Sequence, residues 1–101
     1  MQIARVVGTV VSTNKSDKLD GLKLLLTRNI DLDTWTEKGA PVVSIDAVGA
    51  GEGEVVMLVG GSSSRQTNIT DGKPTDSTII AIIDYIDINK KRIFDKHKEN
   101  N

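Results

Sequence analysis

The chain has 101 residues, of which 38% are hydrophobic, and its 13 basic and 14 acidic side chains give a formal net charge of -1 at pH 7. This length predicts a single domain over residues 1–101. The near-neutral charge excludes a general positive field of the kind that draws a protein to nucleic acid or to a membrane surface. The absence of cysteine excludes disulfides, thiolate catalysis and cysteine-ligated metals.

The charges are unevenly distributed along the chain. Residues 89–101 form a basic C-terminal tail with five basic and two acidic side chains, whereas the rest of the chain has eight basic and twelve acidic ones. The N-terminal segment 1–11 lacks the charged start and clean apolar run of a signal peptide. No apolar stretch approaches the length of a membrane span. We therefore expect a cytoplasmic protein with no membrane partner.

Strand signals outweigh helix signals along the whole chain. Short β-branched and apolar segments are separated by clusters of Gly, Pro, Asp, Asn and Ser, which favour turns. These segments predict five strands, at residues 3–13, 22–30, 42–48, 54–60 and 77–88. Within the first of them, Gly8 is a candidate bulge or bend, because glycine weakens a strand interior.

The connecting segments complete the predicted architecture. Residues 31–41 carry several acids, Gly39 and Pro41, which indicate a long hairpin loop. Residues 62–76 predict a polar loop, and residues 90–99 predict a short terminal helix. Five strands in a chain of 101 residues predict an all-β fold, namely a five-stranded OB-like β-barrel with hairpin extensions and a short C-terminal helix.

The fourth and fifth predicted strands are apolar on both faces. Residues 55–59 and 79–83 contain no polar side chain. In an isolated antiparallel barrel one face of each strand should meet water. A second copy of the chain could cover the extra apolar face, which predicts a homo-oligomer. The alternative is a lid formed by the long loop and the tail of the same chain.

The segment 49–54 reads Gly-Ala-Gly-Glu-Gly-Glu and invites comparison with a phosphate-binding loop. The dinucleotide-binding fingerprint needs a different spacing of its third glycine and a helix after it. Here a strand is predicted to follow, and Glu52 and Glu54 would repel a phosphate. The glycines are better explained as a tight turn that needs positive φ and close backbone approach.

No catalytic or metal-binding pattern stands out. The serines at 62–64 need a positioned base to act as nucleophiles, and the only histidine, His97, lies in the charged tail. One histidine, no cysteine and scattered carboxylates give no metal-ligand spacing. Asp84 and Asp87 point to opposite faces of the predicted strand and cannot act as a pair. We therefore expect a protein that is not an enzyme and has no cofactor.

The alternative function for an OB-like barrel is binding of single-stranded nucleic acid. Such proteins stack bases on aromatic side chains along a positively charged groove. This chain has three aromatic residues, Trp35, Tyr85 and Phe94, and a net negative body. We therefore expect no nucleic-acid partner.

Several segments together resemble one known family. "MQIARVVGTVVSTNKSDKLDGLKLLL" is similar to its opening, a first strand followed by a Thr-x-Lys turn and a Leu-x-Gly-x-Lys-Leu entry into the second strand. "DAVGAGEGEVVMLVGGSSSRQT" resembles its most distinctive segment, and "TDSTIIAIIDYIDI" with "IFDK" resembles its end. The family is that of the pentameric vertex proteins of bacterial microcompartment shells, found in carboxysomes and in ethanolamine- and propanediol-utilising compartments. Ser64 departs from it, because the family more often has alanine there.

The resemblance implies a five-stranded OB-like barrel that assembles as a cyclic homopentamer. Such a pentamer fills the five-fold corners of a cytoplasmic polyhedral shell, whose facets are hexameric proteins of a different fold. The glycine turns are candidates for the five-fold axis, where copies approach closely without side-chain bulk. Candidates for this axis and its pore are Gly49, Ala50, Gly51, Gly53, Gly60, Gly61, Ser62 and Ser63.

The remaining site predictions concern the edges of the subunit. Candidates for the interface between subunits are Asp46, Glu54, Val56, Leu58, Arg65, Ile80 and Ile82. Among them, Arg65 is expected to pair with Asp46 or Glu54 or with a carbonyl across the interface; the alternative is a solvated loop arginine. Candidates for the rim that faces the hexamers are Lys15, Lys18 and Trp35.

Overall fold

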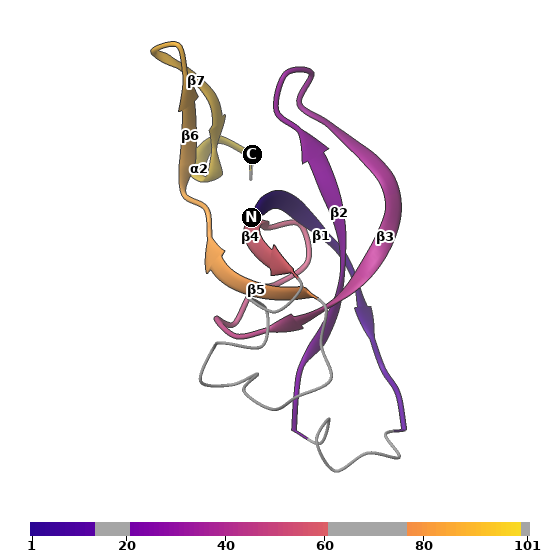
Figure 1. Ribbon diagram of the computed structural model, residues 1–101. Helices are drawn as coiled ribbons and strands as arrows, with labels where there is room; N and C mark the ends of the chain where they lie inside the picture. Colours follow the sequence, from indigo (N-terminus) through magenta and orange to yellow (C-terminus); the bar gives the residue numbers. More distant parts are fainter. Residues whose placement is uncertain (14–20, 61–76, 100–101) are drawn as a thin grey trace.

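The computed structural model describes residues 1–13, 21–60 and 77–99. A closed barrel is built from β1 (Gln2–Val10), β2 (Leu24–Asp31), β3 (Thr36–Asp46), β4 (Val55–Gly60) and β5 (Ser77–Ile82) (Figure 1). The order around the barrel is β1-β2-β3-β5-β4, and β4 pairs back to β1. All pairs are antiparallel except β3 with β5. This arrangement confirms the predicted OB-like barrel.

The barrel interior is filled by aliphatic side chains that alternate with outward-facing ones along the strands. Leu25 from β2 and Ile79 from β5 are among the largest fully buried side chains. Burying one such side chain stabilises the fold by roughly 1.5–3 kcal/mol. The interior cluster consists of Ala4, Val6, Leu25, Ala50, Val56, Leu58 and Ile79.

The barrel closes at a short parallel seam between β3 and β5, where pairing spans Ile45 with Thr78 and Asp46 with Ile79. Next to this seam lies a chain of buried hydroxyl groups. The Ser44 Oγ is 2.8 Å from the Ser77 Oγ and 2.9 Å from the Thr27 Oγ1. These hydrogen bonds join β2, β3 and β5. They therefore help to set the register where ladder pairing is shortest.

A bulge in β1 confirms the expectation for Gly8. Val6 pairs with Thr27 and Gly8 pairs with Leu26, so Val7 is an extra residue in β1. A Cβ at Gly8 would lie 3.3 Å from the Leu26 Cδ1. The close packing explains the glycine, and the bulge bends the strand around the barrel.

The hairpin joining β2 and β3 corrects the predicted long loop at 31–41. Residues 29–31 pair with residues 36–38, which leaves a four-residue turn, 32–35. The Asp31 carboxylate accepts the backbone N–H of Asp33 at 2.9 Å and shapes this turn. Much of the predicted loop, including Gly39 and Pro41, therefore lies in strands. Gly39 and Pro41 lie in an irregular stretch of β3, where the register shifts and Gly39 has a φ of 77°.

The C-terminal segment differs from the prediction in two ways. The predicted strand 77–88 is interrupted: β5 ends at Ile82, and β6 (Tyr85–Ile88) begins a separate two-stranded sheet with β7 (Lys91–Asp95). The predicted helix 90–99 is wrong over most of its length, because only α2 (Lys96–Glu99) is helical. Asn89 and Lys90, with φ of 52° and 66°, form the two-residue turn that this hairpin needs.

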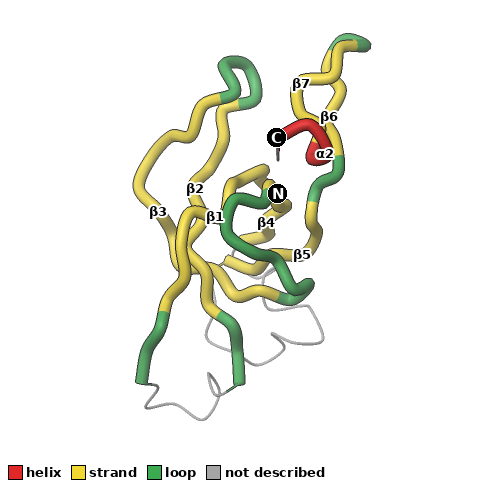
Figure 2. The backbone as a smooth tube through the Cα atoms, turned by 180° about the vertical axis from the view of Figure 1, so that it is seen from behind, coloured by secondary structure: helices red, strands yellow, loops and turns green. Residues whose placement is uncertain are grey.

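The β2–β3 and β6–β7 hairpins rise from the same end of the barrel (Figures 1 and 2). Between them lies a second apolar cluster, in which Phe94 of β7 and Val55 of β4 are buried. The Trp35 ring from the β2–β3 turn stacks on the Phe94 ring, with centroids 5.2 Å apart. Aromatic pairs at this separation add stabilisation beyond their area burial.

This second cluster changes the explanation for the doubly apolar β4. Val55 and Val59 are 1% and 7% exposed within one chain. The loop residue Trp35 and the tail residue Phe94 supply much of the cover over Val55. At Val55, a lid from the long loop and the tail therefore accounts for the burial within one chain. In the part of the chain that the structure describes, no helix is long and apolar enough to cross a membrane.

Candidate assembly surfaces

The turn that follows β3 is organised by Asp46. Its Oδ1 accepts the backbone N–H groups of Val48 and Gly49, each at 3.0 Å. Its Oδ2 lies 3.6 Å from the Lys23 Nζ, which also donates to the Ala50 carbonyl at 2.6 Å. A buried carboxylate needs such partners to offset its desolvation. Asp46 is therefore the structural anchor of the glycine-rich turn.

The second half of this turn is held against β1 and the C-terminus. The Gly53 N–H donates to the Val6 carbonyl at 2.8 Å. The Glu54 Oε1 accepts the Gly51 N–H at 2.8 Å, and its Oε2 lies 2.9 Å from the Lys96 Nζ. The hydrogen bond from Lys96 lowers the pKa of Glu54 below its ordinary value, and Glu54 in turn raises the pKa of Lys96.

Arg5 links the same turn to two other parts of the chain. Its Nη1 donates to the Gly53 carbonyl at 2.8 Å and to the Glu99 carboxylate at 3.0 Å. Its Nε lies 3.7 Å from the Glu37 carboxylate on β3. Together with the Glu54–Lys96 pair, these contacts fasten α2 to the barrel. The basic tail is therefore a docked element over its described residues, 89–99.

The predicted five-fold residues fall into three groups. Gly49, Gly51 and Gly53 lie in the turn between β3 and β4, and Gly60 is exposed at the end of β4. Ala50 is fully buried in the barrel core, so its side chain has no surface to line a pore. Residues outside the described part of the chain are Gly61, Ser62, Ser63 and, from the other site predictions, Arg65, Lys15 and Lys18.

Most of the apolar residues predicted at the subunit interface lie in or against the barrel core instead. Val56 and Leu58 are 0% and 5% exposed inside the barrel, which corrects their assignment to a subunit interface. Ile82 packs against the same core cluster, and Ile80 is half-buried beside a register shift between β4 and β5. Choosing one face of an all-apolar strand from sequence was arbitrary, because the strand gives no polar side chain to mark the outer face.

Two exposed surfaces that the sequence did not reveal stand out instead. On β3, residues 39–43 (Gly-Ala-Pro-Val-Val) are all exposed, with Val42 at 48% and Val43 at 50%. On β6, the Tyr85 side chain is 56% exposed, and the Arg92 guanidinium lies 3.9 Å from its ring centroid. Residues 39–41 were predicted as part of a loop and residues 42–43 as the start of a strand, and no sequence signal marked the two valines as uncovered.

The aromatic residues do not form a base-stacking platform. Trp35 and Phe94 stack on each other, and Arg92 covers one face of the Tyr85 ring. Over residues 1–13, 21–60 and 77–99, no three His, Cys, Asp or Glu side chains come together to hold a metal ion. The charged side chains described above, such as Asp46 and Arg5, hold the protein's own elements together.

Comparison with known proteins identifies the class. The profile of the family described as "Ethanolamine utilisation protein EutN/carboxysome" matches residues 1–84. The carboxysome shell vertex protein CcmL of Nostoc sp. is 41% identical over 96 residues, which are 95% of each chain. The solved structure of Gloeobacter violaceus CcmL matches with a TM-score of 0.89 at 37% identity, over 96% of this chain and 99% of that one.

A third relative is described as pentameric. The GrpN pentameric microcompartment shell protein from Rhodospirillum rubrum matches with a TM-score of 0.77 and 36% identity, over 87% of this chain and 99% of that one. These matches define the chain as a barrel of the shell vertex class. The chain belongs to the EutN/CcmL family, which consists of structural shell vertex proteins and not of enzymes. This membership confirms the resemblance found in the sequence.

Proposed function

We propose that five copies of this chain form a closed ring that caps the vertices of a bacterial microcompartment shell. The observation that carries the proposal is the match, over 87% of this chain, to GrpN, which is described as a pentameric microcompartment shell protein. A flat sheet of hexagons closes into a polyhedron only when pentagons occupy its corners. The proposed function of the protein is to supply these pentagons, next to hexameric shell proteins.

The proposed ring accounts for features that a monomer leaves unexplained. Residues 39–43 of β3 expose two valines to water although the chain is small. Apolar patches of this kind mark contact sites with other proteins. In a cyclic ring each subunit uses two different surfaces, one for each neighbour. The exposed turn glycines are proposed to lie near the five-fold axis, together with Gly61, Ser62 and Ser63.

Arg65 stays our candidate for an ion pair between subunits. Of its two proposed acidic partners, Glu54 fits better, because its side chain is 25% exposed and that of Asp46 is 1% exposed. Lys15, Lys18 and Trp35 are proposed to face hexamers at the rim. Trp35 would do so with the part of its ring that Phe94 does not cover.

Native mass spectrometry over a wide range of protein concentration tests the ring. We expect a pentamer, and a monomer at every concentration would refute the proposal. Co-expression with a hexameric shell protein tests the vertex role separately. Closed polyhedral shells should form with this chain, and open sheets or tubes should form without it, as seen by electron microscopy.

The same material tests the nucleic-acid alternative. Binding driven by phosphate contacts weakens steeply as salt increases. We expect no change in fluorescence anisotropy when a labelled single-stranded oligonucleotide is titrated with the protein at low salt. Salt-dependent binding in the micromolar range would instead favour an OB-fold that binds nucleic acid.

A further inference from the structure

One surface of the chain is an exposed apolar stretch of β3. The side chains of Val42 and Val43 are about half exposed, and the neighbouring residues 39–41 are exposed as well. Across β1 and β2, Val43 pairs with Leu26, and Leu26 pairs with Gly8, next to the exposed Val7 of the bulge. Val42 pairs with the buried Thr27 and so points to the opposite face of β3 from Val43. We therefore call residues 39–41 and Val43, together with Val7, the valine surface.

This part of β3 is also an open strand edge. Among the described residues, β3 pairs with β2 on one side, whereas on the other side its pairing with β5 begins at Ile45. Edges of this kind readily accept a partner. The irregular stretch at Gly39 and the missing N–H of Pro41 oppose addition of another strand. The valine surface is therefore suited to packing by side chains rather than to extension of the sheet.

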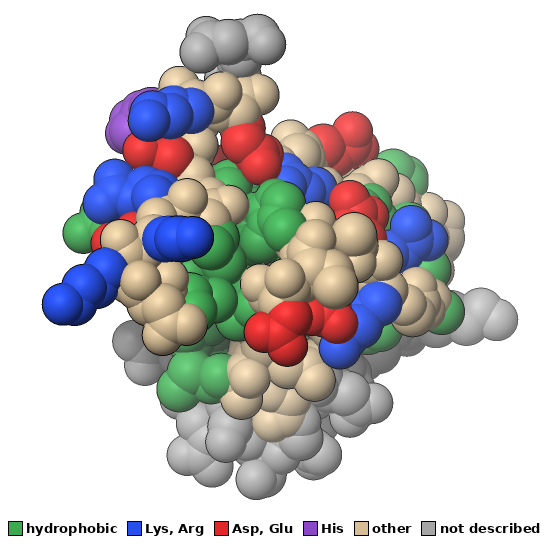
Figure 3. All heavy atoms as spheres, turned by 90° about the horizontal axis from the view of Figure 1, so that it is seen from above, with side chains coloured by type: hydrophobic (Ala, Val, Ile, Leu, Met, Phe, Trp, Pro, Cys, Tyr) green, Lys and Arg blue, Asp and Glu red, His purple; other side chains and the backbone are tan. Residues whose placement is uncertain are grey.

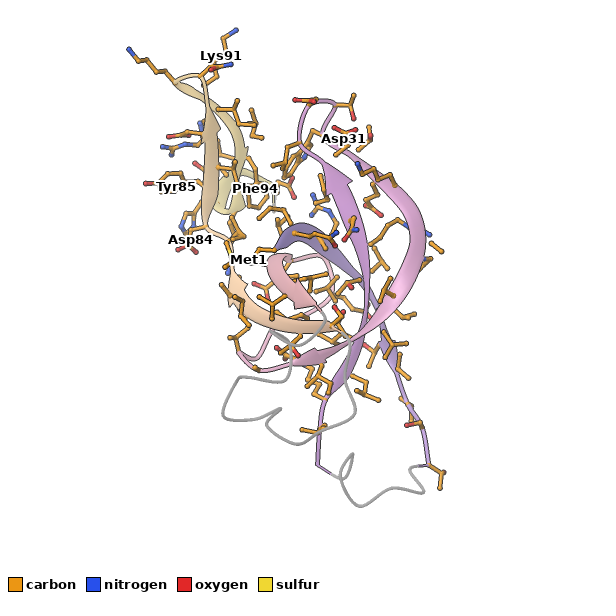
Figure 4. The ribbon with its side chains drawn as sticks, in the orientation of Figure 1. Met1, Asp31, Asp84, Tyr85, Lys91 and Phe94 are labelled. Atoms are coloured by element: carbon orange, nitrogen blue, oxygen red, sulfur yellow. The ribbon has the colours of Figure 1, made fainter. Side chains whose placement is uncertain are left out.

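The opposite side of the molecule carries an aromatic and arginine pair. The β6–β7 hairpin lies on the far side of the barrel from β3 in both ribbon views (Figures 1 and 2). Tyr85 points away from the barrel, whereas Phe94 on the neighbouring strand points toward it (Figure 4). Asp87 holds Arg92 with a 2.8 Å hydrogen bond, so the pair is preorganised. Tyrosine and arginine are the residue types that most often anchor protein interfaces.

The charges at the two hairpin tips are complementary. The β6–β7 tip exposes Lys90 and Lys91, neither of which has an ion pair among the described residues. The turn at the β2–β3 tip exposes Asp33. Both tips lie at the same end of the molecule (Figure 1), and the space-filling view shows Lys and Arg side chains gathered over the C-terminal hairpin at one edge (Figure 3). Opposite charges at the two tips are suited to an ion pair between neighbouring copies of the chain.

We propose that the outer face of the β6–β7 hairpin, with Tyr85 and Arg92, docks onto the valine surface of the next copy of the chain. This inference rests on the proposed ring and names its two contact surfaces. The Tyr85 ring covers the exposed valines, and the hairpin tips contribute a pair of opposite charges. Because the two surfaces lie on opposite sides of one subunit, the contact is head-to-tail, as a closed ring requires.

Cysteine cross-linking tests the contact directly, because the natural chain contains no cysteine. Tyr85→Cys is combined with Ala40→Cys in one variant and with Val43→Cys in another, and each is treated with a short bis-maleimide. We expect covalent ladders up to the pentamer on a denaturing gel. The matched control combines Tyr85→Cys with Val11→Cys, since Val11 is 93% exposed but lies outside the valine surface. The control should give no species larger than a dimer.

The outcomes separate this inference from the proposed ring. A pentamer by native mass spectrometry, together with no ladder from either pair, would overturn the docking and leave the ring intact. A monomer at all concentrations would overturn both. A charge exchange gives an independent measurement. Lys91→Asp and Asp33→Lys should each lower the fraction of pentamer several-fold at low salt, and their combination should restore it. Failure of the combination to restore the pentamer would count against the contact between the tips.

Discussion

The Phe94→Ala substitution is the sharpest test of how the C-terminal hairpin is held. Phe94 is 5% exposed, and its ring stacks on Trp35. The substitution leaves the β6–β7 pairing and the ion pairs of α2 in place but removes the centre of the second apolar cluster. It therefore isolates the contribution of side-chain packing to docking of the hairpin.

The expected cost follows from burial. Truncating a buried phenylalanine to alanine typically costs about 3–5 kcal/mol, which includes the cavity left behind. A two-stranded hairpin is marginally stable by itself in water. The partly exposed Arg5–Glu99 pair contributes little compared with the cluster. We therefore expect a loss of about 3–5 kcal/mol in the free energy of unfolding, with local detachment of the hairpin before the barrel unfolds.

Fluorescence of Trp35, the only tryptophan, reports loss of the Phe94 ring directly, because the two rings are stacked. In Phe94→Ala, the emission should shift to longer wavelength under native conditions, and the midpoint of urea unfolding should fall. All variants must be compared at one protomer concentration, because assembly stabilises the folded state by mass action. Val11→Ala, at a residue that is 93% exposed and outside the valine surface, is the control and should leave the native emission unchanged. An unchanged emission and a loss below about 1 kcal/mol in Phe94→Ala would refute this explanation of docking.

Five further substitutions test the turn, the charges and the seam. Gly53→Ala should destabilise the fold by about 1–2 kcal/mol in thermal unfolding, because φ is +87° there. Gly51→Val, at a position without positive φ, should leave the fold intact but lower the fraction of pentamer in native mass spectrometry. Glu54→Gln should make the free energy of unfolding depend less on pH under acidic conditions. Because the pKa of Glu54 is lowered in the folded state, its ionised form stabilises the fold at pH values above the ordinary pKa of 4.5. This stabilisation is lost as pH falls through the lowered pKa. Lys96→Met should reduce the pH dependence in the same range. Ser44→Ala removes hydrogen bonds to two buried hydroxyls and should cost about 1–3 kcal/mol in urea unfolding; no measurable loss would show that this network does not stabilise the seam.

The candidate site was only partly accessible from the sequence. The tight glycine turn was predicted, and the structure adds its anchors, Asp46 and Glu54. Val56 and Leu58 were placed on the wrong side of their strand, because a segment apolar on both faces gives no cue to its orientation. Exposure of residues 39–43 depends on where β5 joins β3, which is decided by pairing between distant segments.

The sequence by itself determined that five strands form a barrel, that the first has a bulge at Gly8, and which family the chain belongs to. These features rest on local preferences and on short motifs whose residues are neighbours in the chain. Tertiary structure alone decided the course of the C-terminus and the cover over β4. The tail forms a hairpin rather than a helix over 91–95 because Phe94 is buried against Trp35 and Val55. That contact joins residues about forty to sixty positions apart, and tertiary packing of this kind overrides local propensity.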